Sequence, residues 1–238
     1  VFGSNGLVGS SITKILEDSI KVDQLIKSNR SELDLFNKKH VEEFVKEHEP
    51  DVVINAAAKV GGIHANDTKR TEFILENLKI NMNVLESCIE MPMIKIINLG
   101  SSCIYPLNAE NPINESEFMN GKLEPTNSPY AMAKLSAIEI GRSMSKQFGH
   151  KVLNLMPTNL YGPNDYFSDL DSHVIPALIH RMQKTIEVYV YILQLLYFDL
   201  IFLLYLLFLI LKVLTVHKLQ LKPKILDVKI VPLMYRIV

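Results

Sequence analysis

The stretch Ile97-Asn-Leu-Gly-Ser-Ser-Cys-Ile-Tyr105, followed later by Tyr130-Ala-Met-Ala-Lys134, carries most of the information in this 238-residue chain. The first stretch is an apolar run of buried-strand type that ends in glycine and small polar residues. In the second, a tyrosine and a lysine stand four positions apart, so a helix places both on one face. Since a neighbouring ammonium favours the phenolate, we expect Tyr130 to exchange a proton near neutral pH.

Hydroxyl and thiol groups follow the first strand directly. Ser101 or Ser102 would complete a proton-handling trio with Tyr130 and Lys134 around a carbonyl or alcohol. The thiol of Cys103 adds an acid/base group that simple hydride transfer does not need, although a lone cysteine is more often a small buried apolar residue. His173 lies in a loop before a predicted helix, where capping or surface roles are usual, and spacing alone does not pair it with Cys103.

Predicted strands alternate with predicted helices along the chain. Val1 and Phe2 resemble the end of a buried strand, and further strands are expected at 23–27, 51–57, 94–99 and 151–156. Helices are expected at 11–16, 37–48, 66–90 and 130–148. The helix at 66–90 carries Ile74, Leu78, Met82 and Leu85 near helical spacing. This alternation predicts right-handed βαβ units and a Rossmann-type, doubly wound parallel α/β sheet, whose ligands bind at the carboxyl ends of the strands.

A glycine-rich turn, Gly3-Ser-Asn-Gly6-Leu7-Val8-Gly9, stands between the first strand remnant and the first helix. Such glycines allow a tight turn and let backbone N–H groups approach a pyrophosphate at a helix N-terminus. A flexible turn is the alternative reading, but the βαβ setting favours dinucleotide binding. Because almost all of the preceding strand is missing, we expect the chain to be truncated at its N-terminus.

The second predicted strand ends without the acidic residue that usually binds the ribose 2′-hydroxyl of NAD. Lys27, Ser28 and Arg30 stand there instead, and basic residues suit a 2′-phosphate. The sequence therefore favours NADP(H), with an ordinary solvated loop as the alternative. Asp34, just beyond, would accept from the adenine amino group or cap the next helix.

Composition narrows the function classes. A formal net charge of -1 gives no electrostatic footprint for nucleic acid, and two cysteines are too few for a disulfide framework. They suit a reducing compartment, so a cytoplasmic location is expected, without a signal peptide. We expect no metal site.

Five stretches together resemble the extended short-chain dehydrogenase/reductases that act on nucleotide sugars, and within them the GDP-L-fucose synthase family. They are GSNGLVG at 3–9, NAAAKVGGIHAN at 55–66, LGSSCIYP at 99–106, LEPTNSPYAMAK at 123–134, and MPTNLYGPND at 156–165 with SHVIPAL at 172–178. The pairing of GSSCIYP with SHVIPAL is specific to this family, whereas the glycine motif and YxxxK occur throughout the superfamily. The resemblance covers about residues 1–183.

The resemblance implies an NADPH-dependent epimerisation at C3 and C5, and reduction at C4, of GDP-4-keto-6-deoxy-D-mannose to GDP-L-fucose. It assigns Ser101, Tyr130 and Lys134 to the reduction, and Cys103 and His173 to the epimerisation. The family works as a dimer through two helices per subunit, expected here at 66–90 and 130–148. The implied cofactor residues are Gly3, Gly6, Leu7, Val8, Gly9, Arg30, Asp34, Ala57, Lys134, Pro157, Asn159 and Leu160; the implied substrate residues are Ser101, Ser102, Asn159, His173, Val174 and Arg181.

The family pattern stops near residue 187. We therefore expect a cofactor-binding domain at 1–156, only the start of a small substrate-binding domain at 157–186, and an unrelated tail at 187–238. From Lys184 to Val238 there is no Gly, Ala, Ser or Asn, so turn residues are scarce.

Three interpretations of this tail remain open. The apolar run at 188–211 is long enough for a transmembrane helix, but Asp199 near its middle would cost roughly 2.5–3.5 kcal/mol. The basic residues Lys212, His217, Lys218, Lys222 and Lys224 would flank such a span. The tail is otherwise a divergent substrate domain or an out-of-frame translation. Because half of the sugar-nucleotide site is missing, the chain could be inactive.

Two rival functions therefore stand beside the family's own reaction. The first is a nucleotide-sugar 4-epimerase or dehydratase that shares Tyr130 and Lys134. The second is a non-catalytic cofactor-binding remnant, membrane-associated if the 188–211 run is genuine.

Overall fold

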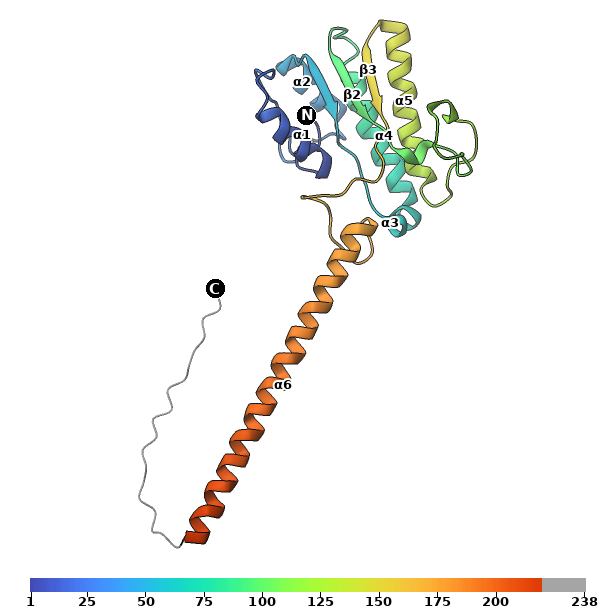
Figure 1. Ribbon diagram of the computed structural model, residues 1–238. Coiled ribbons are helices and arrows are strands. Elements are labelled where there is room, and N and C mark those ends of the chain that lie inside the picture. Colours follow the sequence, from blue (N-terminus) through green and yellow to red (C-terminus); the bar gives the residue numbers. More distant parts are fainter. Residues whose placement is uncertain (220–238) are drawn as a thin grey trace. The chain divides into compact units, whose positions relative to one another are not determined.

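The computed structural model of the protein describes residues 1–219, and only the backbone of 210–219 (Figure 1). The chain divides into two compact units, Val1–Met182 and the part from Gln183 onward. The first unit has the predicted alternation of helices and strands. The second continues helix α6, Val174–Leu219.

The sheet has three parallel strands in the order β1-β2-β3, where β1 is Val52–Asn55, β2 is Lys95–Leu99 and β3 is Lys151–Leu155. Phe2 extends it by an isolated parallel bridge to Asn55. The Phe2 N–H donates to the Ile54 carbonyl (2.9 Å), and the Ala56 N–H donates to the Phe2 carbonyl (3.0 Å). All four segments therefore end at the same edge, as a parallel sheet requires.

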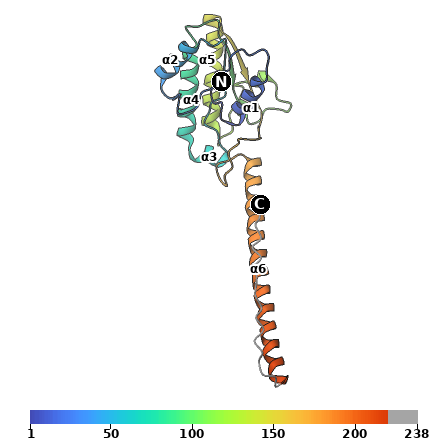
Figure 2. The ribbon, with the colours of Figure 1, turned by 90° about the vertical axis from the view of Figure 1, so that its left-hand side faces the viewer.

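Helices cover both faces of this sheet (Figure 2). Helices α2 (Lys38–His48), α4 (Arg70–Ser87) and α5 (Ser128–Phe148) form one layer, and α1 (Leu7–Glu17) lies on the other side. The short α3 (Ile63–Thr68) and the 3₁₀ turns Ser102–Ile104 and Glu115–Glu117 connect them. The doubly wound α/β fold is confirmed.

The hydrophobic core lies between the sheet and the α2–α4–α5 layer. Val53 and Ile96 from the strands pack with Val84 of α4, Ala137 of α5 and Phe2. Each strand alternates between this buried face and the opposite one, where Leu153 and Leu155 of β3 are 54% and 42% exposed. The alternation is the ordinary consequence of the two-residue strand period.

An asparagine ladder crosses this buried face. Asn55, Asn98 and Asn154 stand in register on the three strands. The Asn98 amide donates to Asn154 Oδ1 (3.0 Å), and the Asn55 amide donates to Asn98 Oδ1 (3.5 Å) and to Asn81 Oδ1 of α4 (3.0 Å). Burying amides is tolerable because they pair with one another.

The strand expected at 23–27 is wrong, because the structure has no strand or ladder in this segment. Its backbone bond to the first strand runs from the Val1 ammonium to the Ile26 carbonyl (2.7 Å). No other backbone hydrogen bond between this segment and the sheet is found in the described chain, and one bond does not make a regular ladder.

The single helix expected at 66–90 is also wrong. It is divided into α3 and α4 at Lys69, whose backbone leaves the helical region (φ −111°, ψ 36°). The buried face of α4 carries Phe73, Asn77 and Ile80, whereas Met82 is 41% exposed. The pattern misled because buried asparagines, read as polar surface, occupy the inner face.

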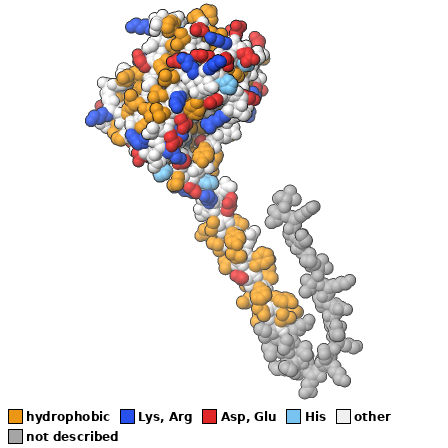
Figure 3. Space-filling view, turned by 180° about the vertical axis from the view of Figure 1, so that it is seen from behind, with side chains coloured by type: hydrophobic (Ala, Val, Ile, Leu, Met, Phe, Trp, Pro, Cys, Tyr) orange, Lys and Arg blue, Asp and Glu red, His pale blue; other side chains and the backbone are white. Residues whose placement is uncertain are grey.

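The second unit consists, within the described residues, of the continuation of α6. Large apolar side chains cover this helix on the side seen in Figure 3. No turn residue interrupts it, in line with the missing Gly and Asn. Part of the predicted tail, including Lys222 and Lys224, lies outside the described residues.

Candidate active site

The loop after β2 is anchored to the end of β3. The Gly100 N–H donates to the Leu155 carbonyl (2.7 Å), and the Ser102 N–H donates to the Pro157 carbonyl (3.1 Å). A Cβ on Gly100 would lie 2.9 Å from Met156 Sδ and 3.1 Å from the Leu155 carbonyl oxygen, so a larger residue would require these neighbours to shift. The loop then turns through Ser102–Ile104, with Ser101 Oγ accepting from the Cys103 N–H (3.3 Å).

Helix α5 brings Tyr130 and Lys134 to this loop. Pro129 in its first turn has the φ angle that a helix start needs. Lys134 is buried, its Nζ donates to the Leu99 carbonyl (2.7 Å), and it lies 5.8 Å from the centroid of the Tyr130 ring. The predicted juxtaposition of strand end, tyrosine and lysine is therefore present.

Burial dominates the electrostatics of the pair. Burial raises the pKa of Tyr130 well above its ordinary value; a negative charge on Cys103 would raise it further, and the hydrogen bond with Ser101 opposes this only partly. Burial lowers the pKa of Lys134 to about 8. The sequence left open whether Tyr130 releases or supplies a proton; desolvation keeps the phenol protonated and favours supply. Tyr130 is thus a proton donor at neutral pH.

Cys103 lies beside the trio. Its side chain is partly exposed, unlike the fully buried Cys88. A negative charge on Cys103 would raise the pKa of Tyr130, so the thiol lies within electrostatic reach of the phenol. Cys103 is therefore only partly buried and belongs to neither hydrophobic core cluster.

The loop that carries His173 is fixed to the turn before α3. The Gly62 N–H donates to the Asp171 carbonyl (2.8 Å), and Lys69 Nζ contacts Asp171 Oδ2 (2.7 Å). A Cβ on Gly62 would lie 2.3 Å from the Ser172 carbonyl oxygen. His173 itself is half-buried at the start of α6, and no hydrogen bond joins it to Cys103.

The glycine turn is built by close backbone contacts. Gly3 has a positive φ of 74°, and a Cβ there would lie 2.7 Å from Ala57 N and Cα. A Cβ on Gly9 would lie 2.0 Å from the Gly3 carbonyl oxygen. Gly6 caps α1 without a side-chain hydrogen bond, so the first N–H groups of the helix, from Leu7 and Val8 onward, face outward for an anion.

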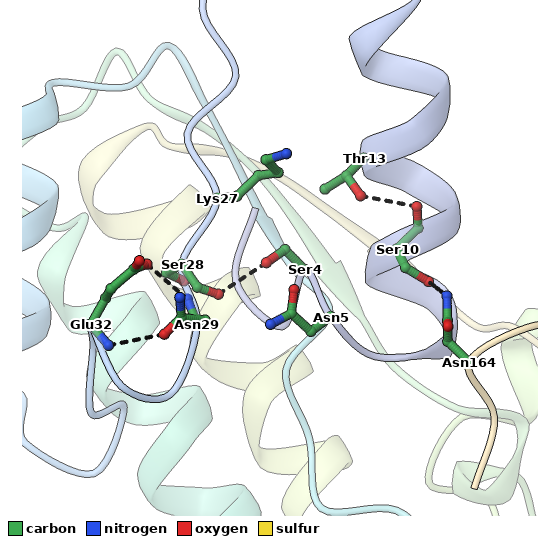
Figure 4. Close-up of a pocket in the computed structure, with 9 residues that line it drawn as sticks. All are labelled: Ser4, Asn5, Ser10, Thr13, Lys27, Ser28, Asn29, Glu32 and Asn164. Carbon is green, nitrogen blue, oxygen red and sulfur yellow. Dashed lines mark hydrogen bonds between the residues drawn. The ribbon is translucent and has the colours of Figure 1, made fainter.

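A polar pocket of about 570 Å³ lies beside this turn (Figure 4). Ser4 Oγ donates to the Ser28 carbonyl (3.0 Å), and Asn164 Nδ2 donates to Ser10 Oγ (3.0 Å). These bonds join the glycine turn, the segment after 23–27 and the loop after β3. The lining consists of Ser4, Asn5, Ser10, Thr13, Lys27, Ser28, Asn29, Glu32 and Asn164.

Only some of the residues expected to distinguish NADP(H) from NAD(H) line this pocket. Lys27 lines the pocket but is paired with Glu17 (2.6 Å), and Arg30 is not among the lining residues. Asp34 accepts from the Phe36 N–H (2.9 Å), while Asn37 and not Asp34 caps α2. Of the two readings of Asp34, helix capping is therefore wrong.

The remaining predicted residues lie along the loop after β3 and the start of α6. Pro157 is held to Ser102, whereas Asn159 and Leu160 are exposed. Val174 is exposed, and an Arg181 guanidinium nitrogen donates to the Asp169 carbonyl (3.0 Å).

Two contributors escaped sequence reasoning. Phe73 presents its ring edge-on to Tyr130, with centroids 6.4 Å apart, and Asn164 closes the polar pocket. The signal for Asn164 was its place in a loop at a strand's carboxyl end; nothing in the sequence pointed to Phe73. Among the described residues, no cluster of His, Cys, Asp and Glu could hold a metal ion.

The fold and the residues at this edge of the sheet are those of the Rossmann-type, extended short-chain dehydrogenase/reductase class. More particularly, the chain belongs to the NAD dependent epimerase/dehydratase family, whose model matches residues 1–202.

Individual relatives are similar over the same region. GDP-L-fucose synthase of Escherichia coli is 44% identical over 184 residues, which is 77% of this chain and 57% of that protein. GDP-L-fucose synthase 1 of Arabidopsis thaliana is 46% identical, with 77% and 57% covered. The structure of a GDP-D-glycero-L-gluco-heptose synthase from Campylobacter jejuni, solved with NADPH, is 33% identical with a TM-score of 0.69, covering 74% of this chain and 52% of that one. The chain thus spans little more than half the length of these proteins.

Proposed function

We propose that residues 1–186 are the cofactor-binding and proton-transfer part of a GDP-sugar epimerase–reductase of the GDP-L-fucose synthase type. The observation that carries this proposal is the position of the Ser101 loop, which ends at Cys103, against Tyr130 and Lys134 at the carboxyl edge of the sheet. In this proposal 1–156 bind the cofactor, 157–186 begin the sugar site, and 187–238 belong to neither.

NADP(H) is the proposed cofactor. The packed glycines, the uncapped start of α1 and the polar pocket fit a dinucleotide diphosphate. Lys27, Ser28 and Asn29 line the end of the pocket where a ribose phosphate would lie, and Arg30 follows them. The carboxylate of Glu32, which also lines the pocket, would repel a phosphate. The preference for NADP(H) over NAD(H) therefore rests on the basic side chains of Lys27 and Arg30.

When bound, the nicotinamide supplies a hydride to C4 of the sugar. Tyr130, protonated because burial raises its pKa, donates its proton to the C4 oxygen. Ser101 polarises the same carbonyl through its hydroxyl. Lys134 holds a positive charge near the phenol and binds the ribose. The lowered pKa of Lys134, about 8, lets it release a proton to the phenolate at neutral pH.

The epimerisation uses the additional thiol and imidazole. The C4 ketone makes the protons at C3 and C5 acidic, since the carbanion delocalises as an enolate. Cys103 as thiolate removes each proton from one face, and His173 returns one from the other. In this proposal Asn159, Val174 and Arg181 contact the GDP-sugar.

Incubation of the chain with NADPH and GDP-4-keto-6-deoxy-D-mannose in D₂O tests both steps. We expect enhanced NADPH fluorescence on binding, deuterium at C3 and C5, and oxidation of NADPH. Cys103→Ser should bind NADPH but abolish deuterium incorporation. A 4-epimerase or dehydratase would keep its turnover in Cys103→Ser, and NADPH binding with no sugar-dependent chemistry would indicate a non-catalytic remnant.

The proposed assembly is a homodimer through α4 and α5, and the proposed location of this unit is the cytoplasm. A patch on these helices supports dimerisation: Ile74 and Met132 line one shallow pocket, and Met132 is 47% exposed. Free thiols at Cys88 and Cys103 suit a reducing compartment.

A further inference from the structure

We propose that α6 is a membrane anchor, and that a lipid bilayer covers its apolar part at 188–211. This inference is independent of the proposed reaction. Its basis is the surface of the helix itself: within Val174–Leu209 an 18-residue window has a mean hydropathy of 2.3, and none of that window is buried.

The apolar surface surrounds the helix instead of forming a stripe. Between Val188 and Leu211 every residue except Gln194 and Asp199 is Leu, Ile, Val, Phe or Tyr. Successive positions such as Phe202, Leu203 and Leu204 are 63%, 66% and 56% exposed, so no side faces a core. A helix that is apolar all round belongs in a protein interior or in a bilayer, whereas a coiled-coil partner needs only a seam.

Two soluble explanations for such a helix do not match the described residues. The core helix of a soluble protein is largely buried, and this one is not. A signal sequence lies near an N-terminus, whereas this run follows the catalytic unit. A second copy of the chain would cover one side of each helix and leave the rest in water.

The dimensions and flanks match a bilayer. About 24 helical residues span roughly 36 Å, enough to cross a hydrocarbon core of about 30 Å with some tilt. Tyr189 and Tyr191 lie at its first turn, where the interface favours aromatic rings. Basic residues stand on both sides of the run, Lys184 before it and Lys212 after it, which suits lipid headgroups.

Asp199 is the one acidic residue in the run. A carboxylate near the middle of a span costs roughly 2.5–3.5 kcal/mol on insertion, a cost that the surrounding apolar side chains outweigh. Replacing it with leucine should therefore strengthen membrane insertion.

The test is synthesis of the full chain in a cell-free system with vesicles of phosphatidylcholine and phosphatidylglycerol (4:1). We expect most of the chain to float with the vesicles, to resist alkaline carbonate, and to leave a protease-protected peptide containing 188–211. Leu203→Arg with Leu207→Arg should reduce the floating fraction at least fivefold, and Asp199→Leu should increase its resistance to carbonate. Ile20→Lys with Met93→Lys, at exposed positions outside the helix, should change neither.

Three results would overturn the proposal. In the first, the protein stays in the buffer or pellets as an aggregate. In the second, it forms a lipid-free oligomer through α6. In the third, the two arginine substitutions leave the fraction that floats with the vesicles unchanged. A further experiment examines the protein isolated from the organism that makes it. Mass spectrometry of its tryptic peptides should find the tail peptide Val213–Lys218. Peptides from another reading frame after codon 184 would overturn it as well.

Discussion

The ammonium of Lys134 donates a 2.7 Å hydrogen bond to the carbonyl of Leu99, the last residue of β2. The bond joins the helix that carries the proton donor to the strand end that carries Ser101. It also makes a buried cation part of the fold, since Lys134 is 3% exposed. The stability of the protein should therefore respond to the protonation of this lysine.

The first prediction concerns pH. The pKa of Lys134 is lowered from 10.5 to about 8, so between these values the unfolded chain binds more protons than the folded one. Stability from this group therefore rises with pH across that window, at up to about 1.4 kcal/mol per pH unit. The unfolding free energy of the parent minus that of Lys134→Met should increase from pH 8 to 9, measured by urea unfolding followed by circular dichroism.

Lys146→Met, at an exposed position in the last turn of α5, is the control. Its difference from the parent should stay constant over the same range. The variant's unfolding free energy must be subtracted from the parent's because two other groups act in the opposite direction. The pKa of Cys88 is raised to about 11 and that of Tyr130 is raised too, so both make stability fall as the pH rises further. A flat difference for Lys134→Met would show that the lysine is not desolvated.

The second prediction separates two glycines of the same turn. Gly9→Ala places a Cβ 2.0 Å from the Gly3 carbonyl oxygen, so the backbone must move and stability should fall by about 1–3 kcal/mol. Gly6→Ala meets nothing closer than 3.5 Å and should cost less than about 1 kcal/mol. Thermal unfolding compares them.

NADPH titration of the same two variants adds a functional readout. Gly6→Ala should weaken NADPH binding while leaving the fold intact, because its methyl group lies beside the N–H groups of α1. Unchanged affinity would remove the glycine turn from the cofactor site.

The third prediction concerns the His173 loop. Gly62→Ala must displace Ser172, whose carbonyl oxygen would be 2.3 Å from the new Cβ. We expect faster proteolysis within 165–173 and faster carbethoxylation of His173. Gly149→Ala, with a φ of 79° but nothing within 4 Å, should cost about 1 kcal/mol and leave both rates unchanged. Equal rates in the two variants would mean that Gly62 does not hold the loop.

The fourth prediction concerns the proposed dimer. Met82→Lys with Met132→Lys puts charges on exposed apolar positions of α4 and α5 and should give a monomer in sedimentation velocity in mild detergent. Met93→Lys, 88% exposed and outside both helices, should leave the dimer intact. A dimer that survives the double change would have to use another surface.

Sequence reasoning succeeded where residue chemistry is local. The runs ending at Asn55, Leu99 and Leu155 are apolar enough to be strands, and Tyr130 and Lys134 meet because a helix turn brings them together. It failed where burial decides. The pKa of Tyr130 depends on desolvation, and α4 hides asparagines that pair only in three dimensions.

The segment at 23–27 shows a second limit. Its residues suit a strand, but a strand needs a ladder, and in the described chain the one backbone hydrogen bond from the first strand to this segment is that of Val1 to Ile26. Likewise, no pattern could reveal that Lys69 would leave the helical region and contact Asp171, more than 100 positions away along the chain.

The asparagine ladder has a consequence for how the sheet assembles. Slipping one strand by a single residue would carry its amide to the other face and leave Asn55, Asn98 or Asn154 facing aliphatic side chains. Three apolar strands of similar length could otherwise pair in several alignments of nearly equal energy. The amides therefore specify the strand register. They contribute less to the stability of the native sheet than to the energy gap between it and sheets with shifted strands.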